Sequence, residues 1–564
     1  MSDVILTEVE HIKAASRRLR GTLVESLNDP LTGAIAEPDT QVSKFHGIYQ
    51  QDDRDIRSER TRQKLEPAYS FMIRARIPGG LLTTSQWLGM DRIATQHANK
   101  TIRLTTRQAI QFHGVIKRKL KETVADINRS TLDTIAACGD VNRNVMSPSL
   151  PVLSSIHREV QAHAETLSEH LMPKTRAYHE IWLDGKKLDS SAAEIEPIYG
   201  DTYLPRKFKA AFVIPPQNDV DVFAQDLGFI TIIRGGRIAG FNVTVGGGMG
   251  MTHGETDTYP RLADVMGFVG PENLLAVATA VVTTQRDYGD RSNRKHARLK
   301  YTIEDRGIDW FQSEVERRSG VTFAAAKKFA FVANGDVYGW QRDDVGAWHY
   351  GLFIENGRVG DFGDRRLLSG LRAIAERHDS EFRLTPNQNL IISKVSDQAK
   401  AEINGLLIAY GIENSVHSSR LRLNSMACVA FPTCGLAMAE SERYLPTLID
   451  KLDAMLAELG LADKPVTIRM TGCPNGCARP YIAEIGLVGK GPGRYTLFLG
   501  AGFAGERLGA PVLDNASEAD VLAALQPMFA DFAAHRDDGE HFGDFLVRTG
   551  AVREVHAGRQ IHER

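Results

Sequence analysis

The chain has 564 residues, with 68 Lys and Arg against 70 Asp and Glu and a formal net charge of −2. A near-zero net charge argues against a general nucleic-acid or polyanion binder, which normally has an excess of basic residues, so any anion site must come from local clustering. The longest apolar run, residues 274–282, has about half of the ~20 residues that span a membrane. No secretory leader is recognisable at the start, and five cysteines do not make a disulfide scaffold. We therefore expect no nucleic-acid partner, no membrane partner and a cytoplasmic location.

The first 68 residues differ from the rest of the chain. Residues 51–62 alternate acidic and basic side chains and contain little apolar material. Such a segment is either a solvated arm or a docking segment that becomes ordered on a partner. Both interpretations stay open at this point.

Strand-like and helix-like segments alternate after this arm. Residues 71–77 alternate apolar and basic side chains and end at Pro78-Gly79-Gly80, which predicts a strand followed by a turn. We expect a helix over about 84–97 and a second strand over 102–113. A further helix is predicted over 438–459, where apolar residues recur at every third or fourth position. This succession indicates an α+β fold.

An internal repeat indicates that the fold is duplicated. The triplet Arg103-Leu104-Thr105 returns 280 residues later as Arg383-Leu384-Thr385, and both copies follow a strand-like run that ends in a glycine turn. A weaker echo relates residues 236–248 to residues 493–502. We expect two pseudo-twofold halves with a site at their interface.

Four of the five cysteines form two close pairs. Cys428 and Cys434 enclose five residues, and Cys473 and Cys477 enclose three. Structural zinc sites usually have two to four intervening residues, whereas four thiolates at wider spacing suit a [4Fe–4S] cluster. A non-enzymatic four-cysteine metal scaffold stays as a remote alternative. Cys138 stands alone and is interpreted as an inert buried thiol.

Several short basic clusters lie in apolar or glycine-rich surroundings. At alternate positions of a strand, two bases point to one face of a sheet. Each pair alone is more often a solvated face, but together with the glycine run 246–248 they indicate the walls of a polyanion site. The clusters are Arg74 with Arg76; Arg103 with Arg107; Arg143; Arg206 with Lys207 and Lys209; and the bases between Arg286 and Lys300.

These motifs carry a resemblance that covers essentially the whole chain. The cysteine spacing with T-G-C-P-N-G-C at 471–477, together with H-G-I-Y-Q-Q-D-D-R at 46–54 and Y-L-P-R-K-F-K at 203–209, resembles the sulfite and nitrite reductase family. Within this family the chain is most similar to the haemoprotein (beta) subunits of the NADPH-dependent assimilatory sulfite reductases. The resemblance implies duplicated, pseudo-twofold ferredoxin-like halves, with three domains around a central cofactor site.

The resemblance also implies roles for individual residues. The cluster ligands would be Cys428, Cys434, Cys473 and Cys477, and Cys477 would also bind the sirohaem iron. The bases that face the substrate anion would be Arg74, Arg143, Lys207 and Lys209. The remaining sirohaem contacts would be Arg103, Arg107, Gln111, His113, Arg294, Lys295, Arg298, Lys300 and Asn475.

The implied domains and activity follow from the same resemblance. The domains would be an N-terminal partner-docking arm (1–68), a discontinuous ferredoxin-like domain (69–136 plus 340–415), a sirohaem and substrate domain (137–339), and a cluster and sirohaem domain (416–564). The implied reaction is the six-electron reduction of sulfite to hydrogen sulfide in sulfate assimilation and cysteine biosynthesis. The chain has no glycine-rich dinucleotide fingerprint, so NADPH, FAD and FMN are expected only on a flavoprotein (alpha) subunit. A ferredoxin-dependent sulfite reductase and an assimilatory nitrite reductase with the same cofactors stay as alternatives.

Overall fold

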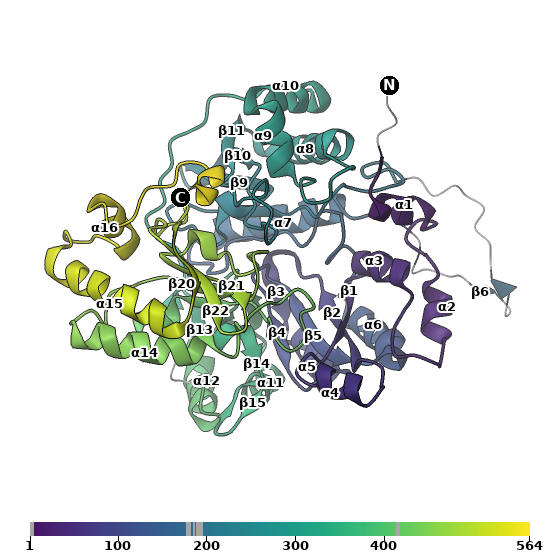
Figure 1. The fold of residues 1–564 in the computed structure, drawn as a ribbon, viewed down its shortest axis with the longest axis horizontal. Coiled ribbons are helices and arrows are strands. Elements are labelled where there is room, and N and C mark those ends of the chain that lie inside the picture. The colour runs from purple at the N-terminus through teal and green to yellow at the C-terminus, as the bar shows by residue number, and fades with distance from the viewer. Residues whose placement is uncertain are drawn as a thin grey trace.

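Three parts make up the fold (Figure 1), of which the computed structural model describes residues 5–175, 177, 182–183, 186–187, 196–412 and 418–563. In that view two sheets with their helices lie at the bottom. A central part with α8 (Leu274–Tyr288) and α10 (Ile308–Ser319) lies at the top, and a C-terminal part with α14 (Leu445–Glu458) and α16 (Phe542–Arg548) lies at the left. No helix within the described ranges is both long and apolar enough to cross a membrane.

Two antiparallel five-stranded sheets correspond to the two copies of the internal repeat. Their orders are β1-β2-β5-β4-β14 and β12-β13-β18-β17-β3. The strands of the first sheet are β1 (Ile48–Asp52), β2 (Tyr69–Ala75), β5 (Ile110–Val115), β4 (Ile102–Leu104) and β14 (Arg358–Val359). Those of the second are β12 (Gly339–Arg342), β13 (Trp348–Leu352), β18 (Leu390–Val395), β17 (Glu381–Leu384) and β3 (Leu81–Thr83).

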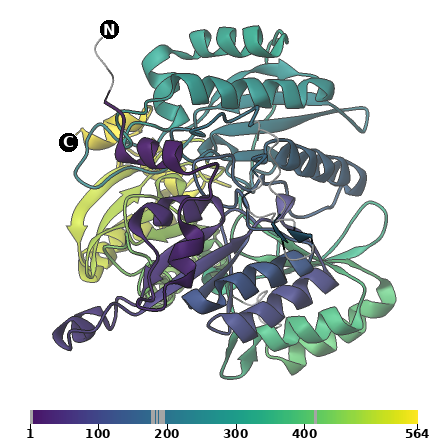
Figure 2. The ribbon, with the colours of Figure 1, turned by 90° about the vertical axis from the view of Figure 1, so that its right-hand side faces the viewer.

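Each half contributes one strand to the sheet of the other. β14 follows the turn of the second half and pairs with β4, so that Arg358 lies opposite Arg103. In the same way β3 of the first half pairs with β17, where Leu81 lies opposite Arg383. One continuous apolar core lies beneath both sheets, and Figure 2 shows the two halves side by side below the teal central part. The exchange makes the two halves a single folding unit.

The strand predicted over 102–113 is wrong, because two strands and a turn occupy this range. β4 ends at Leu104 and β5 begins at Ile110. Between them the Thr105 hydroxyl accepts hydrogen bonds from the backbone N–H groups of Arg107 and Ala109, and Gln108 adopts a left-handed φ of 48°. These local bonds close a turn that the hydrophobic pattern does not reveal.

Two other sheets repeat a second topology. The central sheet has the order β11-β10-β9-β8, and the C-terminal sheet has the order β19-β20-β21-β22-β23. In each, a parallel pair (β8 with β9, β20 with β21) precedes an antiparallel hairpin, which is the weak echo predicted from sequence. The bounds are β8 (Ala210–Val213), β9 (Leu227–Arg234), β10 (Arg237–Val245), β11 (Asp264–Val269), β19 (Ser425–Ala427), β20 (Ile468–Thr471), β21 (Ile485–Gly491), β22 (Arg494–Leu499) and β23 (Ala510–Ala516).

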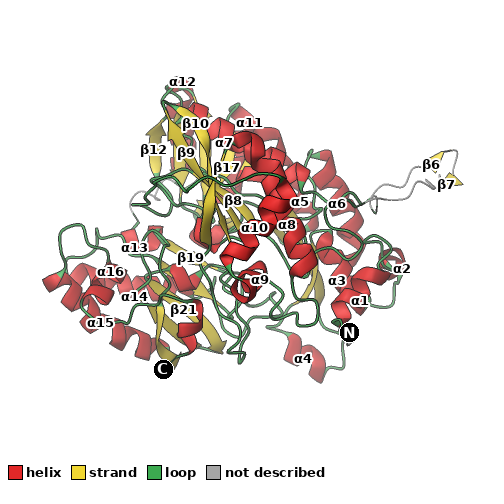
Figure 3. Cartoon of the chain, turned by 90° about the horizontal axis from the view of Figure 1, so that it is seen from above, coloured by secondary structure: helices red, strands yellow, loops and turns green. Residues whose placement is uncertain are grey.

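Helices cover one or both faces of these sheets. The helix predicted over 84–97 is confirmed as α5 (Thr84–His97), which begins with a capping box formed by Thr83 and Gln86. The helix predicted over 438–459 starts later, as α14, because residues 442–444 form a turn and Pro446 occupies its first turn. Figure 3 shows α14 and α16 along one side of the molecule, away from the N-terminal helices. The other long helices are α6 (Leu120–Arg129), α7 (Ser154–His170), α9 (Leu299–Arg306), α11 (Leu367–Arg377), α12 (Asp397–Ala409) and α15 (Glu518–His535).

The N-terminal segment is more than a solvated arm. Its helices are α1 (Glu8–Ala15), α2 (Leu23–Asn28), α3 (Glu37–Phe45) and α4 (Arg57–Arg62), and β1 forms the edge of the first sheet. Val42 and Phe45 are buried in the core of the central part. Only α4 has no buried residue. The predicted domain boundary between residues 415 and 416 lies outside the described residues.

Candidate functional site

The two cysteine pairs meet because β19 and β20 run parallel. Ala427 lies opposite Met470 at the ends of these strands, and Cys428 and Cys473 follow just beyond. The Cys428 backbone N–H donates to Met470 O at 3.1 Å, and the Gly472 N–H donates to Cys428 Sγ at 3.3 Å. Only glycine fits at 472, since a Cβ there would lie 2.6 Å from Ala439 O. The strand register therefore places both pairs at one sheet edge.

The four thiols lie within electrostatic range of one another. Burial first, and then the charge of Cys477, raises the pKa of Cys473 to about 12 and also raises the pKa of Cys428 and Cys434. Within the described ranges no three His, Cys, Asp or Glu side chains converge closely enough to bind one metal ion. A tetrahedral zinc, with Zn–S bonds of about 2.3 Å, would require such convergence, so the wider arrangement suits a cluster of several irons.

Asn475 contacts the second cysteine pair. Its Nδ2 donates to Cys473 Sγ at 3.6 Å. Gly476 has a φ of +60°, and a Cβ on it would lie 2.9 Å from Met249 O. The predicted sirohaem contact of Asn475 stays a prediction.

Polar residues form a row across the first sheet. Arg74 lies opposite Gln111, and Gln111 lies opposite Arg103 on the next strand, so the three side chains share one face. At the matching positions of the second half, Gly351 lies opposite Ile391, and Ile391 lies opposite Arg383. The second half therefore keeps only the arginine of this row.

Arg103 is held by protein groups. Its Nη2 donates to Ala427 O at 2.8 Å, and its Nη1 lies 3.5 Å from a Glu442 carboxylate oxygen. The geometry thus connects Arg103 to the strand end before Cys428, and its predicted contact with a sirohaem carboxylate stays a prediction.

Other bases remain without a partner. The side chains of Arg107, Arg206, Lys207 and Lys209 have no hydrogen bond or ion pair to any residue that the structure describes. Burial first, and then Arg206, lowers the pKa of Lys207 well below its ordinary value, while the charge of Cys477 acts in the opposite direction. Lys207 therefore lies within electrostatic range of both Arg206 and Cys477. Such a concentration of unpaired cations requires an anion.

Arg74 and Arg143 complete this cation group together with two residues that sequence reasoning missed or misread. Arg74 Nη1 donates to Cys138 Sγ at 3.2 Å, so Cys138 is no inert core thiol. Burial lowers the pKa of Arg143, but the charges of Tyr49 and Cys138 act more strongly in the other direction, so this pKa is raised. Tyr49 lies in the H-G-I-Y motif, which could have indicated its place.

Unsatisfied polar atoms mark the same region. Arg74 Nε, Arg107 Nε and His113 Nε2 are buried without a hydrogen-bond partner in the described parts of the chain. Burial, and then Arg358, lowers the pKa of His113 well below its ordinary value, so this imidazole is neutral at pH 7. Buried groups of this kind normally have partners, so a bound molecule supplies them.

The stretch 294–300 is largely paired with other protein groups. Arg294 Nη1 lies 2.9 Å from an Asp140 carboxylate oxygen, and the half-exposed Lys295 Nζ lies 2.6 Å from Glu255. Protein carboxylates thus pair with both charges, and the predicted sirohaem contacts of Arg294 and Lys295 stay predictions.

Arg298 and Lys300 are also saturated. Arg298 Nη2 lies 2.8 Å from Asp226, and Lys300 Nζ donates to the carbonyls of Gly248 at 3.1 Å and Gly250 at 2.7 Å. Lys300 thus closes the glycine run, and the predicted sirohaem contacts of both residues stay predictions.

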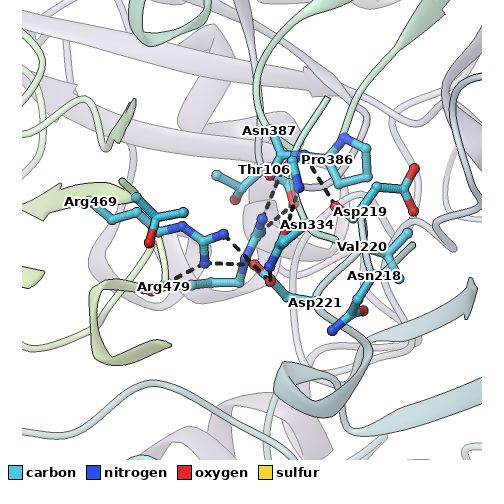
Figure 4. A network of polar contacts seen from close by, with 12 residues as sticks. Thr106, Asn218, Asp219, Val220, Asp221, Asn334, Pro386, Asn387, Arg469 and Arg479 are labelled. Carbon is cyan, nitrogen blue, oxygen red and sulfur yellow. Dashed lines mark hydrogen bonds and ion pairs between the residues drawn. The ribbon is translucent and has the colours of Figure 1, made fainter. Parts of the chain in front are cut away.

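A buried network anchors the segment after Cys477 (Figure 4). Asp221 accepts from Arg479 and, at 2.7 Å, from Arg469. Arg479 also donates to Thr106 O at 3.0 Å and to Pro386 O at 2.9 Å. The Thr106 hydroxyl donates to the Cys477 carbonyl at 3.1 Å. All three parts of the fold thus meet beside Cys477.

Comparison with known proteins places this geometry in a family. The description "Nitrite/Sulfite reductase ferredoxin-like half domain" matches residues 62–130 and 341–410, and "Nitrite and sulphite reductase 4Fe-4S domain" matches residues 162–323. A Staphylococcus saprophyticus protein named sulfite reductase [NADPH] hemoprotein beta-component is 56% identical, covering 99% of this chain and 98% of that protein. The protein of the same name from Myxococcus xanthus is 57% identical over 97% of both chains. The chain belongs to the sulfite and nitrite reductase family.

Solved structures agree on the fold of this reductase. The structure of Mycobacterium tuberculosis NirA protein is 26% identical, with a TM-score of 0.77 and 96% of each chain covered. The predicted α+β fold with duplicated ferredoxin-like halves is therefore confirmed. Residues 162–323, which match the 4Fe-4S domain description, contain no cysteine. In this reductase the cysteines lie in the second copy of that sheet topology.

Proposed function

We propose that this chain is the haemoprotein component of an NADPH-dependent sulfite reductase, which reduces sulfite to hydrogen sulfide with six electrons. The observation that carries the proposal is the group of unpaired cations within electrostatic range of Cys477, one of four thiols that two parallel strands place at one sheet edge. The names of relatives that are 56% and 57% identical over almost the whole chain agree with it. The reaction serves sulfate assimilation and cysteine biosynthesis.

The residues present fit a sirohaem and a [4Fe–4S] cluster. Cys428, Cys434, Cys473 and Cys477 would hold the cluster, and Cys477, which is exposed, would also face the sirohaem iron. The unpaired bases would neutralise the carboxylates of the tetrapyrrole, among them Arg107. When bound, the two groups supply the electrons and the iron that holds the substrate sulfur.

The cations act on the substrate anion. Arg74 and Arg143 keep their charge at all physiological pH values, so they bind and polarise sulfite oxygens. Burial lowers the pKa of Lys207 and Lys209, so each ammonium gives up its proton more readily than an exposed lysine does. Each S–O bond that breaks needs protons to release its oxygen as water, and these lysines are placed to donate them.

A flavoprotein (alpha) subunit delivers the electrons, and we propose that it docks on the N-terminal segment. Seven of the fifteen exposed large apolar side chains in the described ranges precede residue 66. They are Ile5, Leu6, Val24, Leu27, Leu31, Ile56 and Leu65. Exposed apolar side chains concentrated in one segment are typical of an interaction surface. The five cysteines are free thiols, which supports a reducing, cytoplasmic location.

The test is the absorption spectrum of the purified protein with its iron and acid-labile sulfide contents. One haem iron plus one cluster predicts haem-like bands with about five irons and about four sulfides per chain. A colourless protein containing zinc would contradict the proposal.

Turnover then distinguishes the alternatives. We expect sulfite reduction with NADPH and the flavoprotein, and little with reduced ferredoxin. Efficient turnover with ferredoxin alone would assign the ferredoxin-dependent form, and a kcat/KM that strongly favours nitrite would assign a nitrite reductase.

A further inference from the structure

The N-terminal segment contacts the first cysteine loop through one residue, Arg54. This loop joins Cys428 to Cys434, and the turn that follows it lies at the surface: Leu436 is 67% exposed. A surface loop that carries a metal ligand needs support from outside itself. The loop's own bonds include the Cys434 N–H donating to Ala430 O at 2.9 Å.

Arg54 makes four contacts with this loop. Its backbone N–H donates to Pro432 O at 3.1 Å. Its Nη1 donates to Cys434 O at 3.0 Å and to Ala437 O at 2.6 Å, on either side of the exposed turn. Its guanidinium carbon lies 4.4 Å from the centre of the Phe431 ring. One side chain thus closes the turn and covers its aromatic residue.

Two ion pairs flank Arg54 in the sequence. Asp52, on the edge strand β1, accepts from Arg57 Nε at 2.7 Å. Asp55 accepts from Arg443 at 2.6 Å. Neither pair includes a residue of the loop, so the contacts with the loop are made by Arg54 itself.

The charge of Arg54 also acts on the ligand. Arg54 Nη1 donates to the carbonyl oxygen of Cys434 itself, so the guanidinium charge lies beside the residue that carries the thiol. A positive charge beside a thiolate ligand stabilises the more negative, reduced state of a cluster.

We propose that Arg54 is a positioning residue for the iron–sulfur centre: it holds the Cys434 turn in its ligating shape and favours reduction of the cluster. This inference rests on the proposed function, because it takes the four cysteines as cluster ligands. It also connects the segment proposed as the partner's docking site to the electron acceptor inside this chain. A lysine could supply the charge and a donor, but not the planar guanidinium that stacks on the Phe431 ring while its Nη1 bonds both carbonyls.

The experiment compares Arg54→Gln and Arg54→Lys with two controls in the holoprotein. Arg62→Gln removes an exposed arginine of the neighbouring helix that pairs only locally with Glu59. Asp55→Asn breaks the ion pair with Arg443 but leaves the loop contacts in place. The readouts are the rate of cluster loss to an iron chelator, followed by absorbance, and the midpoint potential of the cluster, followed by EPR.

We expect Arg54→Gln to lose its cluster roughly tenfold faster than the wild type, the lower end of the range for lost outer-shell contacts, and to shift its potential to a more negative value. Arg54→Lys keeps the positive charge, so its midpoint potential should match that of the wild type. Its cluster should still be lost to the chelator faster than in the wild type. Both controls should behave as the wild type. Identical behaviour of Arg54→Gln and Arg62→Gln would overturn the proposal, and so would equal effects of Asp55→Asn and Arg54→Gln.

Hydrogen exchange of residues 431–437 separates this inference from the proposed function. We expect faster exchange in Arg54→Gln than in Arg62→Gln, whatever the metal content of the wild type. A wild type without iron and sulfide would refute the reductase proposal, whereas unchanged exchange in Arg54→Gln would refute the role of Arg54.

Discussion

At the scale of single residues, Cys477 differs from the other three thiols. Cys473 is buried, and Cys428 and Cys434 are partly covered, whereas Cys477 is exposed. Lys207 is the base on which the charge of Cys477 acts, so this thiol faces the cation group. A sulfur that faces two sites is suited to connect a cluster on one side with a tetrapyrrole iron on the other.

Replacing Cys477 with Ser should remove both spectroscopic signatures. We expect loss of most iron and acid-labile sulfide, together with the haem-like bands, because a serine hydroxyl is a poor ligand for both groups. Cys138→Ser serves as the control, since its thiol contacts Arg74 and lies apart from the ligand loops. Retention of a normal spectrum by Cys477→Ser would reject the ligand assignment.

The spacing of the cysteine pairs can be found in the sequence, but whether a base is paired with another protein group cannot. Close pairs of cysteines indicate metal binding through their spacing in the sequence. The state of an arginine depends on a partner that is distant in sequence: Arg298 pairs with Asp226, and Arg294 pairs with Asp140. Contacts between residues that are distant in sequence thus decide which bases are paired and which are not.

Lys209 should control the pH dependence of turnover. Burial first, and then Arg298, lowers its pKa, so the ammonium loses its proton at a lower pH than an exposed lysine. Only the protonated form binds an anion and donates a proton, so kcat/KM for sulfite should fall as the pH rises through this lowered pKa.

Kinetics of Lys209→Met measure this contribution. We expect kcat/KM to fall about 100-fold and to lose this limb of the pH profile, with both cofactors retained. Lys295→Met is the matched control, because its ammonium pairs with Glu255 near the surface. An unchanged profile in Lys209→Met would move proton donation to another group.

At the scale of elements, two tight turns set the exchange of strands between the halves. Gly80 and Gly357 precede the exchanged strands β3 and β14, and both have a φ of +73°. A Cβ on Gly80 would lie 2.6 Å from Leu384 O, and one on Gly357 would lie 2.5 Å from Leu104 O. The repeat in sequence predicted that the halves correspond, but not that their strands cross, because pairing partners 300 residues apart leave no local pattern.

Gly80→Ala should destabilise the fold through this close approach. The left-handed φ costs about 1 kcal/mol for alanine, and displacing a backbone carbonyl adds about 2 kcal/mol. Gly236→Ala is a matched control, since its φ is also +73° and nothing lies within 4 Å of its Cβ position. Thermal unfolding should show a clearly larger loss for Gly80→Ala, and equal losses would mean that the strand crossing tolerates the extra atom.

At the scale of the whole molecule, related sheets share their topology but differ in the residues at matching positions. Each pair of related sheets keeps its topology, yet the four metal-binding thiols lie in only one copy. The polar row of Arg74 and Gln111 corresponds to Gly351 and Ile391 in the other half. The duplication could be predicted because the repeat is still visible in the sequence. The copy that carries the paired cysteines could be predicted only because their motif indicates metal binding.

Replacing Asp221 should cost more stability than replacing an aspartate of an exposed ion pair, because Asp221 connects the parts of the fold. It is fully buried, and the guanidinium groups of Arg469 and Arg479 hold its pKa below the usual range against the effect of burial. Asp221→Asn would leave two buried guanidinium groups without their counter-charge, a change that costs about 3–5 kcal/mol. Asp514→Asn removes an exposed ion pair with Lys490 and should cost under about 1 kcal/mol.

Denaturant unfolding, together with the iron content of each variant, tests whether the Asp221 network joins the three parts. Because Arg479 lies two residues after Cys477 and also bonds Thr106 and Pro386, we expect Asp221→Asn to lose both stability and bound iron. Similar unfolding of Asp221→Asn and Asp514→Asn would show that apolar packing alone holds the three parts together. A loss of stability without loss of iron would confine the network to folding, and it would leave the placement of Cys477 to its own loop.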